Sequence, residues 1–380
     1  MPANIALERT NLIDEAVARL RGMLPVSWDV ERSPGAALAR YAPPEGSALV
    51  DDAIDLRARE GMTVTFVVEA KRSFDPRAAE QLSTGVPRML RSLAARFPIL
   101  VVAPWLSART QELLAREEIN FIDLTGNAFI SLEDPALYIR AAGATRNPEP
   151  PPRGRATVRG PKAARLIRLL VDVQPPYGVS EIAAATELAP GYVSRLLDAL
   201  DRAALVERAR RGRVEDADIA GLLRRWAESY DVLKTNDASF FLAPGGAKEA
   251  LSRLAELPDP TTVTITGSFA ALRIAPVAAP ALLIAYSNDV ESVAKELGLL
   301  PADEGANVAL LRAFDPIVWD RGSEEPGLRY VAPSQAAVDC LTGNGRMPAE
   351  GEALISWMQE NEPRWRLSSI EDLRVSEGAP

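Results

Sequence analysis

The chain of 380 residues contains no histidine. This absence excludes Ser-His-Asp and Cys-His catalytic arrangements, histidine general bases and zinc sites with histidine ligands. Any catalysis must therefore use carboxylates, lysines, hydroxyl groups or a metal ion held by oxygen ligands, which are the ligands that Mg²⁺ prefers.

The chain also has a single cysteine, Cys340, so an intramolecular disulfide is excluded. Such a low cysteine content is typical of proteins in a reducing cytoplasm. We therefore expect a cytoplasmic, nucleoid-associated protein. The surrounding AAVDCL has the pattern of a buried helical turn, which predicts an inert thiol. No apolar run approaches the ~20 residues of a membrane helix, and the N-terminal segment lacks the basic and apolar regions of a signal peptide.

Charge is distributed unevenly. The net charge is −9, yet residues 153–213 hold 12 Lys and Arg against 6 Asp and Glu. One basic block in an acidic chain indicates a local DNA-facing surface. A solvated pair of arginine-rich helices would give the same composition.

The length predicts two or three domains. RNPEPPPRGRATVRGPK, residues 146–162, is rich in proline, which disfavours regular structure and is typical of a semi-rigid linker. We therefore expect an α/β multidomain protein with domains at 1–146, 161–234 and 240–370, the first two joined by a linker at 147–160.

The first block alternates between strand and helix patterns, which predicts an α/β sheet with parallel pairing. Its first helix is expected at 11–24. Strands are expected at 36–42, 52–60, 63–71, 98–104 and 119–124, and helices begin near Pro76 and after an N-cap at Ser107.

A Glu-x-Lys motif ends the apolar segment TVTFVVEAK. Glu69 and Lys71 are two residues apart and so point to the same face of a strand. Asp55 reaches the same place if its strand and theirs form a hairpin, although Asp51 or Asp52 can equally supply the acid. Two carboxylates can hold Mg²⁺ while the lysine positions the attacking water.

These residues, in the order α-β-β-β-α-β, resemble the PD-(D/E)XK superfamily of restriction-endonuclease-like proteins. The resemblance implies a Mg²⁺-dependent DNA endonuclease with Asp55, Glu69 and Lys71 as catalytic residues. Asp55 and Glu69 would be metal ligands, and Glu15 is similar to an extra acidic ligand in part of that superfamily. A nuclease-like domain without activity is the alternative interpretation.

The second block carries a helix–turn–helix pattern in GVSEIAAATELAPGYVSRLLDAL, followed by a basic strand pair around RRG. Ser180 is the expected N-cap of the first helix, and Pro190 begins the second. This arrangement predicts a winged helix-turn-helix that inserts into the major groove and contacts phosphates. The expected DNA-binding residues are Ser180, Tyr192, Ser194, Arg195, Arg208, Arg210, Arg211 and Arg213. A winged helix that binds protein is the alternative.

The third block is again α/β. TVTITGSFAALRIAP gives a strand, a Gly-Ser turn and a helix, and ALLIAYSND gives a strand that ends at Asp289. The pattern resembles a nucleotidyltransferase core. Such cores need a pair of acids for two metal ions. Only Asp289 is present beside Ser287 and Asn288, so we expect a catalytically silent relative.

INFIDLTGNAFISL, residues 119–132, contains Gly126-Asn127, which is typical of a tight hairpin turn. Together with the linker, the basic block and residues 305–322 and 327–358, it resembles the AbiEi-type antitoxins of type IV toxin–antitoxin systems. The resemblance implies a DNA-binding autorepressor, homodimeric on an inverted repeat, in a toxin–antitoxin or phage-defence locus. Its third block would face a nucleotidyltransferase-like toxin.

Three functions remain open: a transcriptional regulator, a Mg²⁺-dependent endonuclease delivered by its winged helix, and a toxin-neutralising protein. Gln335, Asp339 and Arg346 are expected on an exposed helix face, either solvated or in contact with the toxin. Strand register decides whether Asp55, Glu69 and Lys71 converge.

Overall fold

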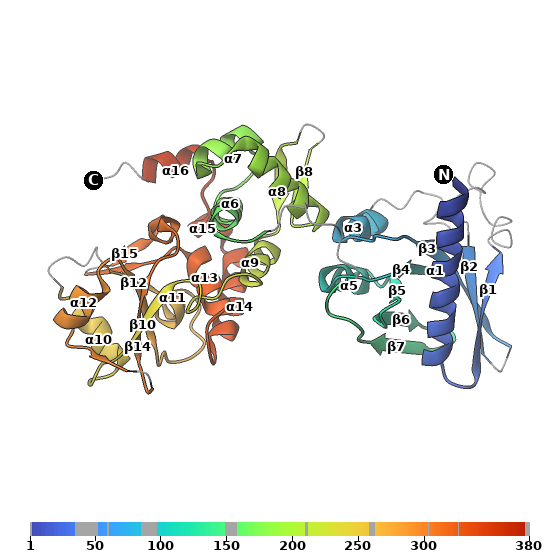
Figure 1. Cartoon of the computed structure of the whole chain (residues 1–380), viewed down its shortest axis with the longest axis horizontal. Helices are drawn as coiled ribbons and strands as arrows, with labels where there is room; N and C mark the ends of the chain where they lie inside the picture. The colour runs from blue at the N-terminus through green and yellow to red at the C-terminus, as the bar shows by residue number, and fades with distance from the viewer. Residues whose placement is uncertain are drawn as a thin grey trace. The chain divides into compact units, whose positions relative to one another are not determined.

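The computed structural model of the chain describes residues 2–34, 52–58, 61–84, 97–148, 158–209, 212–257, 263–302, 304–325 and 327–376. It contains two compact units, residues 1–154 with 202–204 and residues 155–201 with 205–380 (Figure 1). Each unit holds a mixed β-sheet with helices, which confirms the expected α/β multidomain class. The second unit includes both the basic helical block and the third block.

The sheet of the first unit has seven strands in chain order, β1 to β7. They are β1 (Trp28–Pro34), β2 (Asp52–Ala58), β3 (Thr63–Ala70), β4 (Ile99–Ala103), β5 (Asn120–Asp123), β6 (Ala128–Leu132) and β7 (Leu137–Ala141). The helices are α1 (Pro2–Met23), α3 (Pro76–Thr84) and α5 (Ala108–Arg116). β3, β4 and β5 are parallel, and the flanking pairs are antiparallel. The strand expected at 36–42 lies outside the described residues.

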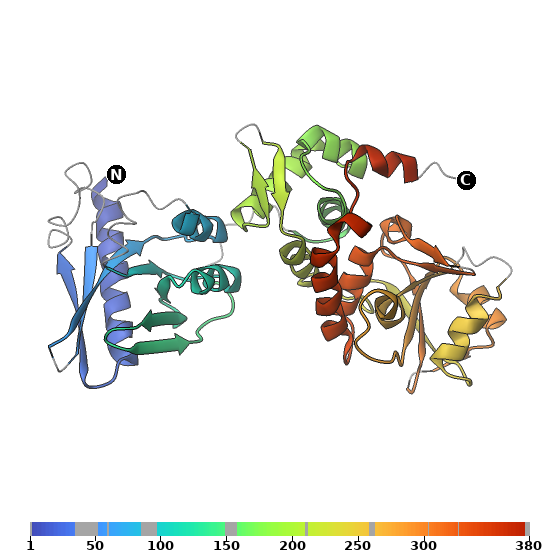
Figure 2. The same cartoon turned by 180° about the vertical axis from the view of Figure 1, so that it is seen from behind.

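Helices cover both faces of this sheet. α1 packs Ile13 and Leu20 against Phe66 and the other residues of one face, while α3 and α5 cover the opposite face around Val101 (Figures 1 and 2). Successive strand residues point to opposite faces. Burial on both sides explains why TVTFVVEA and ILVVA are almost continuously apolar.

The second unit contains a seven-stranded sheet in the order β13-β10-β14-β12-β11-β16-β15 and a separate hairpin, β8–β9. The strands are β8 (Val206–Arg208), β9 (Val214–Ala217), β10 (Asp237–Leu242), β11 (Val263–Thr266), β12 (Leu283–Ser287), β13 (Leu300–Pro301), β14 (Val308–Arg312), β15 (Ser323–Glu325) and β16 (Leu328–Tyr330). The helices are α6 (Pro161–Asp172), α7 (Val179–Thr186), α8 (Pro190–Arg202), α9 (Ile219–Ala227), α10 (Ala247–Leu254), α11 (Gly267–Ile274), α12 (Val290–Glu296), η2 (Pro316–Trp319), α13 (Pro333–Leu341), α14 (Met347–Glu360), α15 (Glu362–Trp365) and α16 (Glu371–Ser376).

Two predicted helix caps have different outcomes. Ser107 is the N-cap of α5, where its hydroxyl accepts a hydrogen bond from the Thr110 N–H at 3.1 Å, as expected. Ser180 is not a cap, because α7 begins at Val179 after the N-cap Gly178. The Glu181 carboxylate reaches back to accept from the Gly178 N–H at 2.5 Å, so glutamate at this spacing supplies the cap.

The core of the second unit contains a buried carboxylate, Asp339 on α13. It accepts hydrogen bonds from Thr266 (2.6 Å), Tyr230 (2.8 Å), Tyr286 (2.9 Å) and Gln335 (2.8 Å). Burial raises the pKa of Asp339 to about 6, against the opposing effect of these hydrogen bonds. The network ties α13 to β11, β12 and the segment after α9.

The expected exposure of Gln335 and Asp339 is therefore wrong, because both side chains are fully buried; Arg346 alone is exposed. Cys340 is buried as expected, and burial raises the pKa of its thiol. None of the helices in the described part of the chain combines the length and apolar character needed to cross a membrane.

Candidate nucleic-acid interface

The Glu-x-Lys motif lies at the end of β3. The Lys71 ammonium is 2.8 Å from the Glu69 carboxylate, and the two side chains are 50% and 31% exposed. The same ammonium is 5.4 Å from the centroid of the Phe74 ring, a cation–π distance. The Glu69 carboxylate is thus paired with Lys71, and the Lys71 ammonium contacts both Glu69 and the Phe74 ring.

The register of the β2–β3 hairpin separates Asp55 from this pair. Asp55 is opposite Thr65 and accepts a 2.6 Å hydrogen bond from its hydroxyl. Thr65 precedes Glu69 by four residues, which is about 13 Å along a strand. Asp55 and Glu69 share a face, but the structure does not bring them together.

The other candidate acids are also placed away from Glu69. Asp52 points to the α1 face, like Ile54, and pairs with Arg32 at 2.6 Å. Glu15 is exposed on α1, which covers that face rather than the Glu69 face. Asp51 lies outside the described residues.

Within the described ranges, no group of three or more carboxylate or thiol side chains has the geometry of a metal site. Asp55, Glu69 and Glu15 therefore do not fit a shared Mg²⁺ ion. The register, which the spacing in the sequence does not encode, is the physical reason for this outcome.

The segment IDLTGN forms a turn built around Asp123, a fully buried carboxylate. One oxygen of Asp123 accepts from the N–H and hydroxyl of Thr125 and from the Asn127 N–H. The other accepts from the Leu106 N–H and the Asn127 amide. Gly143 passes so close that a Cβ would lie 2.4 Å from the Thr125 carbonyl oxygen. These contacts explain the residues of the IDLTGN segment by the structure of the turn that they form.

In the second unit, α7 and α8 are joined by a short turn at residues 187–189. Glu187 has a φ of 55° and ends α7 in the left-handed conformation. The apolar residues expected between the helices are buried, as predicted: Ile182, Ala183, Val193, Leu196, Leu197 and Leu200. Packing of this face leaves the opposite face of α8 outward.

The outward face of α8 carries Tyr192, Ser194 and Arg195. Arg195 is exposed, and in the part of the chain that the structure describes it forms no ion pair. Partial burial raises the pKa of Tyr192, and the positive charge of Arg195 opposes this shift, so the two side chains are close. Ser180, on α7, is also exposed.

The hairpin arginines differ in their contacts. Arg208 pairs with Asp198 of α8 and donates to the Gly212 carbonyl at 3.3 Å, which leaves 15% of its side chain exposed. It therefore fastens the hairpin to α8 and is not available for a phosphate contact. Arg213 is half exposed and donates to the Pro176 carbonyl at 3.0 Å. Arg210 and Arg211 lie outside the described residues.

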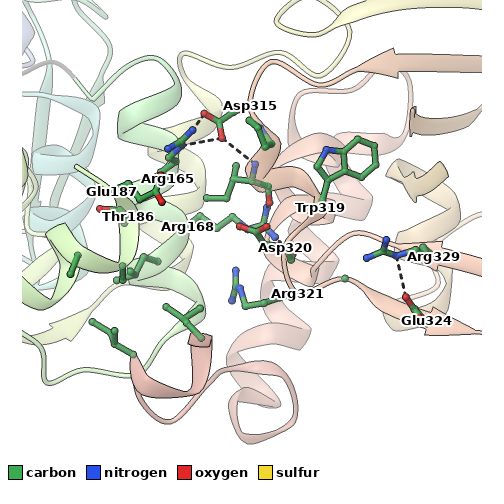
Figure 3. Close-up of a pocket in the computed structure, with 18 residues that line it drawn as sticks. Arg165, Arg168, Thr186, Glu187, Asp315, Trp319, Asp320, Arg321, Glu324 and Arg329 are labelled. Atoms are coloured by element: carbon green, nitrogen blue, oxygen red, sulfur yellow. Dashed lines mark hydrogen bonds and ion pairs between the residues drawn. The ribbon is translucent and has the colours of Figure 1, made fainter. Parts of the chain in front are cut away.

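Two further cations lie beside α8. A groove of about 400 Å³ is lined by Arg159 and Lys162 at the start of α6 and by Tyr192. Glu187 and the paired Arg165 and Asp315 (Figure 3) also line it. Arg159 and Lys162 are exposed. In the sequence, only their position in the basic block indicated that Arg159 and Lys162 belong to this surface. Their proximity to Tyr192 depends on the packing of α6 against α7.

In the third block, Asp289 is the N-cap of α12. Its carboxylate accepts from the Ser292 N–H at 3.0 Å, and its own N–H donates to the Ser287 hydroxyl at 3.1 Å. These local bonds account for the carboxylate at the end of β12.

Comparisons with protein-family models, with curated proteins and with solved structures find no match for this chain. These comparisons therefore do not show that the chain belongs to the families that its motifs resemble. Function must be inferred from the geometry of the side chains themselves.

Proposed function

We propose that this chain is a sequence-specific, double-stranded DNA-binding transcriptional regulator. In this proposal α6–α9 and the β8–β9 hairpin form a winged helix-turn-helix domain, with α8 as the recognition helix. The observation that carries the proposal is the outward face of α8, where Arg195 is exposed and the half-buried Tyr192 lines a groove together with Arg159 and Lys162.

Each part of this surface suits a different contact. An exposed guanidinium on a helix can bind the O6 and N7 atoms of guanine in the major groove, and tyrosine and serine can bind bases or phosphates. In the proposed complex Arg159 and Lys162, which line a groove with Tyr192 of α8, contact the phosphates that flank the helix. The base contacts specify sequence, and the phosphate contacts supply affinity that depends on salt.

The geometry supports this function better than the endonuclease. The acids and lysine of the nuclease-like motif are dispersed or paired among themselves, whereas α8 presents an arginine without an ion pair in the described chain. An autorepressor in a toxin–antitoxin or phage-defence locus is the specific form that we propose. A two-fold-symmetric site would then require a homodimer.

Selection of bound sequences from a random duplex library by the full-length protein tests the proposal. We expect one enriched site, present upstream of the protein's own gene and bound about 10³-fold or more tighter than a scrambled duplex. Absence of enrichment, with selected and scrambled duplexes bound equally, would contradict it.

A further inference from the structure

Each of the two seven-stranded sheets has two edge strands, and three of these four edges are protected against pairing with a further strand. β1 carries three charged residues and ends at Pro34, β13 has two residues, one of them Pro301, and β15 has three residues, two of them glutamates. Charges, prolines and short length are features that block pairing at an edge. β7 differs from these strands, because its sequence LYIRA contains no proline and one charge, at Arg140 (Figure 1).

The hydrogen bonds between β5 and β6 show which way the backbone groups of β6 point. The Asp123 N–H donates to the Asn127 carbonyl at 2.9 Å. The Ser131 N–H donates to the side chain of Asn120 on β5 at 2.8 Å. The odd-numbered residues in and next to β6 thus direct their backbone groups toward β5. Because these directions alternate along an antiparallel strand, the even-numbered residues direct theirs toward β7.

This alternation leaves the backbone groups of Tyr138 and Arg140 at the outer edge of β7. Ile139 is opposite Ile130, so its N–H and C=O point to β6. Those of Tyr138 and Arg140 point the other way, where no other described strand is paired with β7. Both side chains are exposed on one face of the sheet. The Tyr138 ring packs edge-on against Phe129 at 6.0 Å, and Arg140 forms no ion pair among the described residues.

The residues of this edge are complementary to a second copy of themselves. In an antiparallel pair of β7 strands centred on Ile139, Tyr138 of each copy lies opposite Arg140 of the other. Each such pair exchanges two backbone hydrogen bonds, and the guanidinium comes within reach of the tyrosine ring for a cation–π contact. On the opposite face, the partly buried Leu137, Ile139 and Ala141, which pack against the core under α1, meet the same three residues of the other copy.

We propose that two copies of this chain associate through β7, so that their sheets form one continuous antiparallel sheet across a two-fold axis. The paired edges are short, so we expect a weak dimer with a Kd on the order of 1–100 μM. This association does not depend on DNA binding. It supplies the homodimer that the proposed function needs on a two-fold-symmetric site.

Sedimentation equilibrium of the full-length protein over a range of concentrations tests the association. We expect the wild type to dimerise and Tyr138→Pro to raise the Kd about tenfold or more, because proline there removes an N–H that points outward and not one that pairs with β6. Arg140→Gln should raise the Kd about threefold or more, and it remains informative if Tyr138→Pro fails to fold. The matched control, Lys248→Gln, removes an exposed charge on α10 and should leave the Kd unchanged.

A monomer at every concentration up to about 1 mM would overturn the proposal. A dimer with the same Kd in the wild type, Tyr138→Pro and Arg140→Gln would also overturn it, since the interface would then lie elsewhere.

Disulfide trapping in the full-length protein tests the register. The two Ile139 residues form a pair without hydrogen bonds, with Cα atoms about 4.5 Å apart, which a disulfide can span. Ile139→Cys should therefore form a covalent dimer on oxidation. Tyr138→Cys should not, because position 138 is opposite position 140. A covalent dimer of Tyr138→Cys but not of Ile139→Cys, or of neither variant, would contradict the pairing.

This proposal and the proposed function can fail separately. A dimer held by β7 in a protein that selects no DNA site would contradict the proposed function alone. Selective DNA binding by a protein that stays monomeric would contradict the β7 pairing alone.

Discussion

The charged side chains at the end of β3 and those on the outward face of α8 differ in what they contact. Glu69 and Lys71 neutralise each other at 2.8 Å, whereas Arg195 is exposed and without an ion pair in the described chain. Opposite charges on one strand face can satisfy each other, so a Glu-x-Lys motif is weak evidence for catalysis. The groove beside α8 holds three cations, Arg159, Lys162 and Arg165, against the carboxylates of Glu187 and Asp315. This excess of positive charge favours an anionic ligand.

The largest effect is expected at the turn around Asp123, whose charge, like that of Glu69, is satisfied inside the fold. Its carboxylate accepts five hydrogen bonds. Asp123→Ala leaves those donors unpaired and should lower the local opening free energy by about 3 kcal/mol or more. Hydrogen exchange in β4–β6 should then accelerate on the order of 100-fold. The control, Glu133→Ala, removes an exposed carboxylate at the far end of β6. Similar exchange in both variants would show that the turn is not held by Asp123.

Asp339 gives a test that depends on pH. Its pKa is raised to about 6 from 3.8 by burial, so the folded state binds this proton more tightly than the unfolded chain. The resulting stabilisation is complete below the unfolded pKa and is lost as the pH rises through the folded pKa. Between about pH 4 and pH 7, the unfolding free energy of the wild type should fall by about 2 kcal/mol relative to Asp339→Asn. Urea denaturation at a series of pH values measures this difference. Parallel pH profiles would contradict the raised pKa.

Local patterns in the sequence predicted the packing of α7 and α8, because an apolar spacing of three and four residues defines one face of a helix. They also predicted the cap at Ser107. They did not predict the distance between Asp55 and Glu69, which depends on hairpin register. Nor did they predict the proximity of Lys162 to Tyr192 or the pairing of Arg208 with Asp198, since tertiary packing produces both contacts.

Lys162→Gln should weaken binding to selected and scrambled duplexes by similar factors, because a phosphate contact carries no sequence information. The slope of log K against log salt should become shallower by about 0.9. The matched control is Lys248→Gln, which removes an exposed charge on α10. Fluorescence anisotropy at several salt concentrations measures both quantities. A slope unchanged from that of the control would remove Lys162 from the interface.

Glu69→Ala should have the smallest effect. A partly exposed ion pair contributes little, so the unfolding free energy should change by about 0.5 kcal/mol or less. DNA incubated with Mg²⁺ or Mn²⁺ should remain intact with the wild type and with the variant. Metal-dependent cleavage by the wild type that is lost in both Glu69→Ala and Lys71→Ala would restore the endonuclease hypothesis.

Arg195 provides the most direct test of the central claim, that α8 reads DNA sequence. The ratio of affinities for the selected and the scrambled duplex should be measured for the wild type, Arg195→Gln and Lys248→Gln. We predict that Arg195→Gln lowers this ratio by about 10- to 100-fold, equivalent to roughly 1–3 kcal/mol of base discrimination. Lys248→Gln should leave the ratio unchanged. An unchanged ratio in Arg195→Gln would contradict the assignment of α8 as the recognition helix.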